Sequence, residues 1–170
     1  MNEVVIEPVR DDAQASHIAT LVWAFLDHLR VRYPERVRDI DEYVAYQDID
    51  GQLRNWRDIF LPPVGECLLA SMDGAPVGVV MLRRLDDTTC EMNRMYVTDA
   101  ARGRKIGRRL GETLIARARE MGFTSMRLDA WDRHEEALPL YKSLKFEREW
   151  DEGLKPATMS HEMIHMRRTL

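Results

Sequence analysis

The feature that most constrains this chain is a dense basic turn between a predicted strand and a predicted helix. Residues 102–109 read Arg-Gly-Arg-Lys-Ile-Gly-Arg-Arg, which places five cations in eight positions. The run Thr89–Val97 predicts a strand before this turn, and apolar residues recur at helical spacing from Ile106 to Met121 after it. Helices normally favour acidic residues in their first turn, because the first N–H groups carry partial positive charge. The cations here oppose that preference. A multivalent anion bound by those N–H groups would explain them, and a diphosphate is the natural candidate.

Two glycines strengthen the prediction of an anion site. Gly103 and Gly107 let the backbone approach an anion without intervening side chains, and the guanidinium groups can add charge-assisted hydrogen bonds. The Walker phosphate loop and the dinucleotide-binding loop are excluded, because neither the GxxxxGK[ST] spacing nor the GxGxxG fingerprint is present. A solvated basic face remains the alternative for the charge run taken alone.

The rest of the chain alternates between strand and helix patterns. A helix capped by Asp11 or Asp12 should end at Tyr33-Pro34, and residues 35–60 should form one or two helices interrupted by Gly51. A further helix is expected at Glu135–Leu144. The remaining strands are predicted at Val4–Val9, Glu66–Ser71, Ala75–Arg83, Ser125–Trp131, Phe146–Asp151 and Met163–Thr169. This order predicts a single mixed α/β domain spanning residues 1–170.

Composition excludes several classes of protein. The net charge of −4 argues against a nucleic-acid binder, which needs a basic footprint. No apolar run approaches the roughly 20 residues of a membrane helix, and the acidic N-terminus shows no secretory signal. Cys67 and Cys90 lie in apolar runs and are expected to be buried structural thiols in a reducing cytosol.

The stretch EMNRMYVTDAARGRKIG, residues 91–107, resembles the central motif of the GNAT superfamily of N-acetyltransferases. That signature reads [Q/R]-x-x-[G/A]-x-[G/A] after a strand, and here Arg102, Ile106 and Gly107 match in register. Lys105 occupies a position usually held by glycine or alanine. We expect Lys105 to take helical backbone angles and to point its side chain outward.

A second block is similar to the same family. Residues 128–146 read LDAWDRHEEALPLYKSLKF and follow the pattern L-x-x-x-x-x-N-x-x-A-x-x-x-Y-x-x-x-G-F. His134 replaces the asparagine of that pattern, and Lys145 replaces its glycine. The matching residues are Leu128, Ala137, Tyr141 and Phe146.

The resemblance implies a fold and a co-substrate. The expected fold is a mostly antiparallel sheet of about six or seven strands flanked by about four helices, splayed at the strand that ends near Val97. Acetyl-CoA would lie in the splay, with its pantetheine arm along one strand and its diphosphate on the basic turn. The implied contacts are Met95, Tyr96, Val97, Arg102, Gly103, Arg104, Lys105, Ile106, Gly107, Arg108, His134, Ala137 and Tyr141.

The resemblance also implies catalytic roles. Tyr141 stands where the family's general acid protonates the departing thiolate, although a tyrosine packed on a helix face is the bland alternative. Glu91 is the candidate base, acting directly or through water, or else it only orients the acceptor. Alternation along a strand should place Glu91, Asn93 and Met95 on one face. A backbone N–H near Met95 and Tyr96 should stabilise the oxyanion.

His161-Glu162-Met163-Ile164-His165 matches the HExxH pattern of zinc peptidases. The pattern needs a helix, whereas residues 163–168 alternate as in a strand, which would hold the two histidines roughly 13 Å apart. We therefore predict no metal site.

The predicted activity is transfer of an acetyl group from acetyl-CoA to a primary amine of a small molecule or protein. Residues 1–60 carry twelve acids against seven arginines, which would suit a cationic amine. The alternative is a non-catalytic domain on the same fold that senses coenzyme A or binds proteins. By analogy with the family, a homodimer is possible, and neither nucleic acid nor a membrane is expected as a partner.

Overall fold

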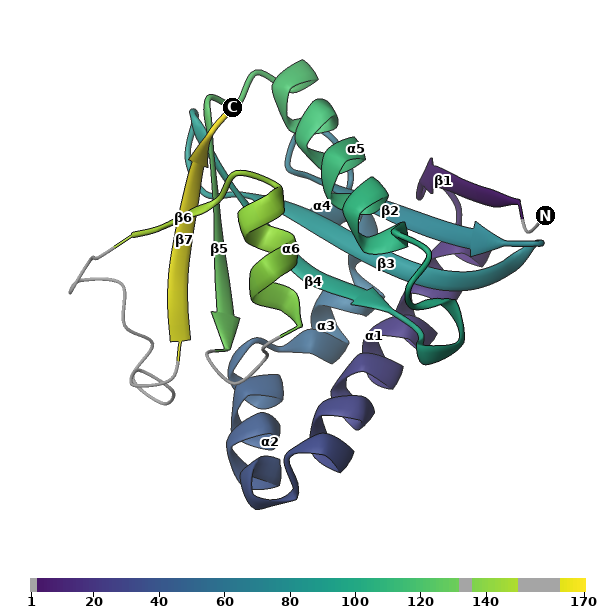
Figure 1. The fold of residues 1–170 in the computed structure, drawn as a ribbon. Coiled ribbons are helices and arrows are strands. Elements are labelled where there is room, and N and C mark those ends of the chain that lie inside the picture. Colours follow the sequence, from purple (N-terminus) through teal and green to yellow (C-terminus); the bar gives the residue numbers. More distant parts are fainter. Residues whose placement is uncertain (1–2, 132–135, 150–162) are drawn as a thin grey trace.

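The fold is a seven-stranded sheet with helices on both faces (Figure 1). The computed structural model describes residues 3–131, 136–149 and 163–170. The strands are β1 (Val4–Pro8), β2 (Gly65–Met72), β3 (Ala75–Arg84), β4 (Thr89–Val97), β5 (Ser125–Trp131), β6 (Glu147–Arg148) and β7 (Met163–Thr169). They lie in the order β1-β2-β3-β4-β5-β7-β6, and only the β4–β5 pair is parallel. The predicted mostly antiparallel α/β fold is confirmed.

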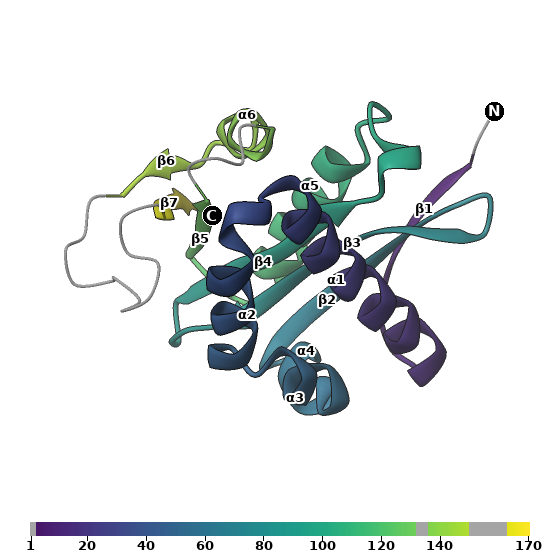
Figure 2. The same cartoon turned by 90° about the horizontal axis from the view of Figure 1, so that it is seen from below.

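The helices divide between the two faces of the sheet (Figure 2). They are α1 (Asp12–Arg32), α2 (Val37–Tyr46), α3 (Ile49–Arg54), α4 (Trp56–Phe60), α5 (Ile106–Glu120) and α6 (Ala137–Ser143), with short 3-10 turns at Pro34–Arg36 and Asp99–Ala101. One face packs against α5 through the fully buried Leu110 and Leu114. The other face packs against α1 through Val22 and Leu26. Each helix therefore buries an apolar stripe of 3.6-residue period against the sheet.

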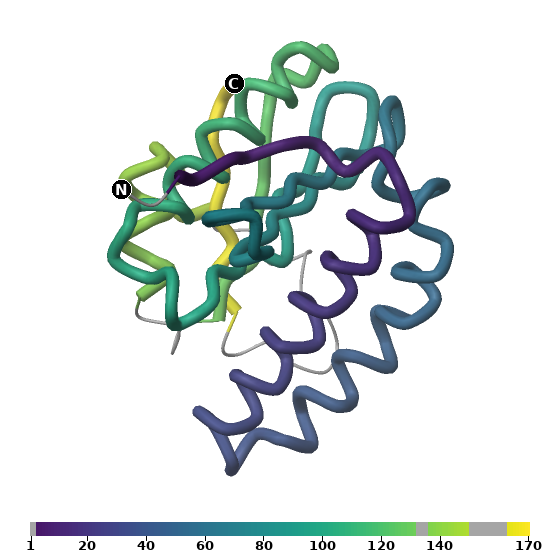
Figure 3. Tube along the Cα trace, turned by 90° about the vertical axis from the view of Figure 1, so that its right-hand side faces the viewer, coloured from purple at the N-terminus to yellow at the C-terminus, as the bar shows by residue number. Residues whose placement is uncertain are grey.

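Helix α1 begins as the sequence predicts. Asp11 is its N-cap and accepts the Gln14 N–H at 2.8 Å, while the Gln14 side chain accepts the Asp11 N–H at 3.3 Å. This reciprocal pair is a capping box. From its end near Tyr33 the chain turns back, so that α2 lies beside α1 (Figure 3).

Residues 35–60 form three short helices after a 3-10 turn, where one or two helices were expected. The break between α2 and α3 falls at Asp48, which has a left-handed φ of 46° and caps α3. The Asp48 carboxylate accepts the Gly51 N–H at 3.2 Å. Gly51 therefore lies inside the first turn of α3 and does not interrupt the helix, contrary to the prediction.

Strand β4 carries the irregularity on which the site depends. Val79 of β3 pairs with Tyr96, but Met81 pairs with Asn93, so that two β4 residues, Arg94 and Met95, stand opposite one β3 residue. Arg94 has a left-handed φ of 50°. This is a β-bulge, and it reverses the alternation of side chains beyond it.

Beside the bulge, β4 separates from β5. The two strands pair only over Thr89–Glu91 and Ser125–Arg127. The Thr98 N–H donates to Val77 at 2.9 Å, so alternation turns the N–H and C=O of Val97 away from β3 and toward the gap. The predicted splay near Val97 is therefore present.

A buried carboxylate joins β2 to helix α5 and to the loop before α1. Glu66 is fully buried and accepts two hydrogen bonds from Arg10, at 2.7 and 2.8 Å, and two from Arg117, at 3.1 and 2.9 Å. Burial alone would raise the pKa of Glu66, but the bonds from Arg10 and Arg117 hold it below its ordinary value. The ionised form is thereby favoured in the folded protein.

Both cysteines are buried and free, as expected of structural thiols. Burial raises the pKa of the Cys67 thiol and raises the pKa of Cys90 to about 12. Neither thiol is therefore a nucleophile at neutral pH.

Glu66→Gln should lower the free energy of unfolding by about 3 kcal/mol, because it leaves two guanidinium groups around a site that no longer carries a charge. Since the pKa is depressed in the folded state, the stabilisation is present above the ordinary value of 4.5 and is lost as the pH falls through the lower, folded-state pKa. Urea unfolding at pH 7 and pH 3 measures both effects. The control is Glu42→Gln, which removes an exposed pair with Arg38 and should cost under about 0.5 kcal/mol; equal losses in the two variants would contradict the assignment.

Candidate active site

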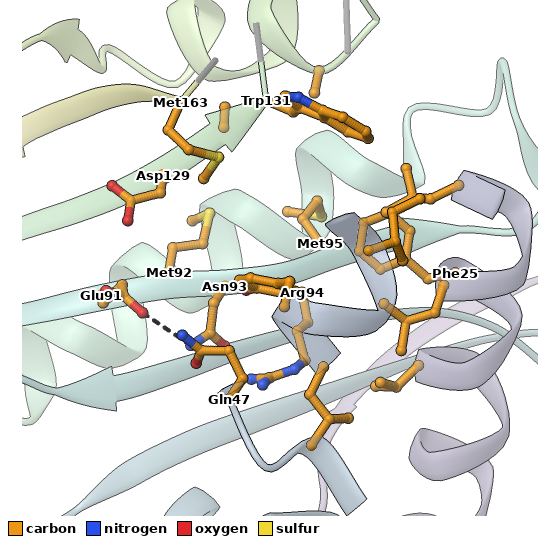
Figure 4. A pocket seen from close by; sticks show the side chains of 18 of the residues that line it. Phe25, Gln47, Glu91, Met92, Asn93, Arg94, Met95, Asp129, Trp131 and Met163 are labelled. Carbon is orange, nitrogen blue, oxygen red and sulfur yellow. Dashed lines mark hydrogen bonds between the residues drawn. The ribbon is translucent and has the colours of Figure 1, made fainter. Parts of the chain in front are cut away.

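A cavity of about 200 Å³ opens beside the bulge of β4. Its walls come from α1, α2, β3, β4, β5, α6 and the start of β7. Figure 4 shows Glu91, Asn93 and Gln47 gathered on one side of the cavity and Phe25 on the other. The lining residues used below are Phe25, Tyr43, Gln47, Arg83, Glu91, Asn93, Arg94, Met95, Asp129, Trp131, Ala137 and Tyr141.

Glu91 is held at the polar end of this cavity. Its Oε1 accepts hydrogen bonds from Arg83 Nη2 and from Asn93 Nδ2, both at 3.2 Å. Among the described residues, no hydrogen bond reaches its Oε2. A carboxylate oriented in this way keeps one oxygen available to a molecule in the cavity.

The expectation that Glu91, Asn93 and Met95 share one face is wrong for Met95. Before the bulge, Asn93 lies opposite Met81, which belongs to the core beneath α1. After the bulge, Met95 packs with the core beneath α5, and it is Tyr96 that packs beneath α1. Met95 therefore reaches the cavity from the far side of the splay.

Tyr141 lies on α6 and lines the same cavity. Its ring packs edge-on against Phe146, with 6.3 Å between ring centroids. Burial raises the pKa of Tyr141 to about 12. Its phenol is therefore protonated at neutral pH and can donate a proton or a hydrogen bond.

The basic turn is open at the start of α5. The first turn of this helix holds no acidic residue, and no side chain caps its N-terminus. Arg102 pairs with Asp99 at 3.0 Å and Arg108 with Glu112 at 2.8 Å. Within the described ranges, Arg104 and Lys105 have no ion pair and are exposed. Free N–H groups beside two unpaired cations fit a multivalent anion such as a diphosphate.

The expected helical angles at Lys105 are wrong. Lys105 precedes α5 as its N-cap and has φ 60° and ψ 18°, in the left-handed region. Lys145, the other lysine at a glycine position of the family pattern, also has a positive φ of 66°. Both positions favour glycine because a Cβ crowds the backbone there. At both positions a lysine replaces the family's small residue, but the backbone keeps the positive φ that glycine favours.

The remaining predicted contacts lie around the splay. Gly107 lies where α5, α6 and β4 meet, because a Cβ added there would be 3.3 Å from Leu140 and 3.7 Å from Val97. Ile106 is buried, so only its backbone can meet a ligand. Ala137 lines the cavity with Tyr141, and His134 lies outside the described residues. The structure thus brings Glu91, Met95 and Tyr141 to one cavity, and Gly107 places the start of α5 against Val97 at the end of β4.

Sequence reasoning missed Arg83 and Arg94 as cavity residues. The signal for Arg94 is a break in alternation: polar and apolar residues alternate from Thr89 to Asn93, and Arg94 then follows as a second consecutive polar residue, a break typical of a bulge. Asp129, which bonds to His165 Nδ1, was also missed.

The HExxH stretch falls partly in β7, where Met163–Thr169 form the predicted strand. His161 lies outside the described residues. Among the described residues, no group of three His, Cys, Asp or Glu side chains could hold a metal ion. No helix in the described part is long and apolar enough to cross a membrane.

Comparison with known proteins gives the family of this chain. Residues 22–146 match the acetyltransferase (GNAT) family. An uncharacterized N-acetyltransferase of Schizosaccharomyces pombe is 32% identical over 123 residues, which cover 71% of this chain and 76% of that relative. The chain therefore belongs to the GNAT family and is an acetyl-CoA-dependent N-acetyltransferase, as its two motifs predict.

Solved structures support the fold. An acetyltransferase from Streptococcus agalactiae superposes with a TM-score of 0.75 at 19% identity, over 98% of both chains. A Salmonella typhimurium protein solved with acetyl-CoA has a TM-score of 0.67 at 20% identity, over 98% of this chain and 94% of that one.

Lys145→Gly should raise the free energy of unfolding by about 0.5–1 kcal/mol, because relief of left-handed strain exceeds the entropy that glycine adds to the unfolded chain. Thermal and urea unfolding measure the change. Lys142→Gly, at an exposed position inside α6, should instead lose about 0.5–1 kcal/mol. A loss in both variants would contradict the strain at Lys145.

Proposed function

We propose that this chain acetylates a small primary amine in the cavity beside β4. The observation that carries the proposal is the convergence of Glu91 and Tyr141 on one cavity at the splay of β4 from β5. At about 200 Å³ the cavity is smaller than the roughly 300–1,000 Å³ of sites for drug-sized ligands. A cavity of this size fits a small acceptor amine.

Acetyl-CoA would be held by the gap edge of β4 and by the basic turn. Met95 and Val97 would bond the pantetheine arm as an added strand would, while the backbone of Tyr96 between them faces Val79 of β3. The N–H groups of residues 103–108 and the side chains of Arg102, Arg104, Lys105 and Arg108 would meet the diphosphate. Ala137, which lines the cavity with Tyr141, would contact the arm, and a contact from His134 stays a prediction.

Two residues would move protons. When bound, acetyl-CoA supplies a thioester: the amine nitrogen bonds to its carbonyl carbon, the C–S bond breaks, and sulfur keeps the electron pair. Glu91 Oε2 receives the ammonium proton, directly or through water, or orients the amine. Tyr141 would give its phenolic proton to the sulfur and take back the second proton that the nitrogen loses as the amide forms. The backbone N–H of Met95 would polarise the carbonyl.

We further infer that residues 1–170 act as one acetyltransferase domain. A cytosolic location and a homodimer stay predictions. The alternative of a non-catalytic domain that senses coenzyme A is tested by the same assay, because such a domain would bind acetyl-CoA and release no thiol with any amine.

Tyr141→Phe should lower kcat for acetyl transfer by about 100-fold and leave KM for acetyl-CoA unchanged, because only the proton donor is lost. Thiol release across a panel of amines measures both. Because the Tyr141 pKa is about 12, the ratio of wild-type to variant kcat should stay constant from about pH 7 to 10, where a phenol of ordinary pKa near 10 begins to ionise.

The matched control is Tyr46→Phe, at an exposed tyrosine of α2, which should leave kcat unchanged. Full turnover by Tyr141→Phe would remove Tyr141 from the mechanism. A ratio that falls with a midpoint below pH 10 would contradict the raised pKa.

A further inference from the structure

The guanidinium of Arg94 lies in the wall of the cavity, where the charge of Glu91 favours its ionised form but makes no ion pair with it. Among the described residues it forms no hydrogen bond and no ion pair, and its Nη2 is buried without an acceptor. Burial lowers its pKa from the ordinary value, yet a guanidinium stays charged at neutral pH. An unpaired charge in a buried site is costly, and proteins normally supply it with a partner.

The other charges around Arg94 are already matched. Glu91 pairs with Arg83 through Oε1, and Asp129 bonds to His165. Arg83 adds to the positive charge near Arg94 and has its own Nε buried without an acceptor. Arg83 Nε and Arg94 Nη2 therefore have no acceptor among the described residues, and no carboxylate of the cavity forms an ion pair with Arg94.

An unused acceptor lies beside these donors. Asn93 Oδ1 is buried without a donor, while Asn93 Nδ2 is held by Glu91, which fixes the orientation of the amide. Together with Glu91 Oε2, this oxygen can accept N–H bonds from an ammonium or amine. The polar end of the cavity thus offers a place for a negative group next to a place for a nitrogen.

We propose that the acceptor is an amine of amino-acid size that also bears a carboxylate, with Arg94 binding that carboxylate. The inference rests on the proposed function and names its substrate class. A carboxylate accepts two parallel bonds from one guanidinium, which fixes the acceptor's orientation. The bulge aims Arg94 into the cavity immediately before Met95 and Tyr96, so the bound acceptor lies beside the reacting thioester.

The test compares L-amino acids with their carboxamides, which keep the amine and lose the negative charge. Calorimetric binding in the presence of coenzyme A and thiol release with acetyl-CoA are the two readouts. The wild type should bind and acetylate at least one amino acid about 10- to 100-fold better than its amide, the range expected for a hydrogen bond to a charged group.

Arg94→Met should abolish that preference, leave KM for acetyl-CoA unchanged and raise the melting temperature, because it removes an unpaired buried charge. Arg94→Lys should keep part of the preference. Arg38→Met, at an arginine whose side chain is 90% exposed on α2, should change neither the preference nor KM.

Four results are possible. Equal use of acids and amides by the wild type would overturn the inference while acetyl transfer stands. A lower melting temperature for Arg94→Met would also overturn the inference, since Arg94 would then stabilise the folded protein. Loss of the preference in a stable Arg94→Met protein supports it. Amino-acid binding that depends on Arg94 without any thiol release would support the carboxylate site and refute the proposed function.

Discussion

The separation of β4 from β5 is the constraint on which the rest of this structure depends. Three residue pairs hold the strands together at one end, and the bulge at Arg94 turns β4 away beyond them. A closed sheet would satisfy the backbone of Val97 internally and leave no cavity. The open sheet leaves the Val97 N–H for a ligand, while the Val97 C=O accepts from Arg102 Nε at 3.4 Å. It also brings α6 with Tyr141 to the opposite side of the gap.

The same bulge settles the chemistry of the cavity wall. Without the extra residue, Arg94 would point toward α5 and Met95 would lie beside Asn93. With the extra residue, the side chains of Asn93 and Arg94 both lie on the α1 side of the sheet. Residues 91–94 therefore give the cavity the Glu91 carboxylate, the Asn93 amide and the unpaired Arg94 guanidinium. Phe25, Leu26 and Leu29 of α1 and Trp131 of β5 add an apolar part to the wall, and an apolar surrounding strengthens a polar contact beside it.

The fold and the basic turn could be predicted from sequence because they follow from local patterns. Helical spacing after Ile106 and the cations at 102–109 are visible in any short window. The bulge could not be placed in the same way, since it depends on how β3 and β4 pair, and one shifted residue reverses every later side chain. The backbone angles of Lys105 were predicted wrongly because a lysine does not indicate a left-handed backbone, whereas a glycine at that position would have indicated one.

Amide hydrogen exchange with and without coenzyme A tests the central claim, that the splayed end of β4 and the open turn before α5 form one ligand-binding surface. Exchange should slow at residues 95–97 and 103–108 when coenzyme A is added. It should stay unchanged in α4, which lies at residues 56–60. Coenzyme A that binds while leaving both the β4 edge and the turn as exchangeable as before would contradict the account.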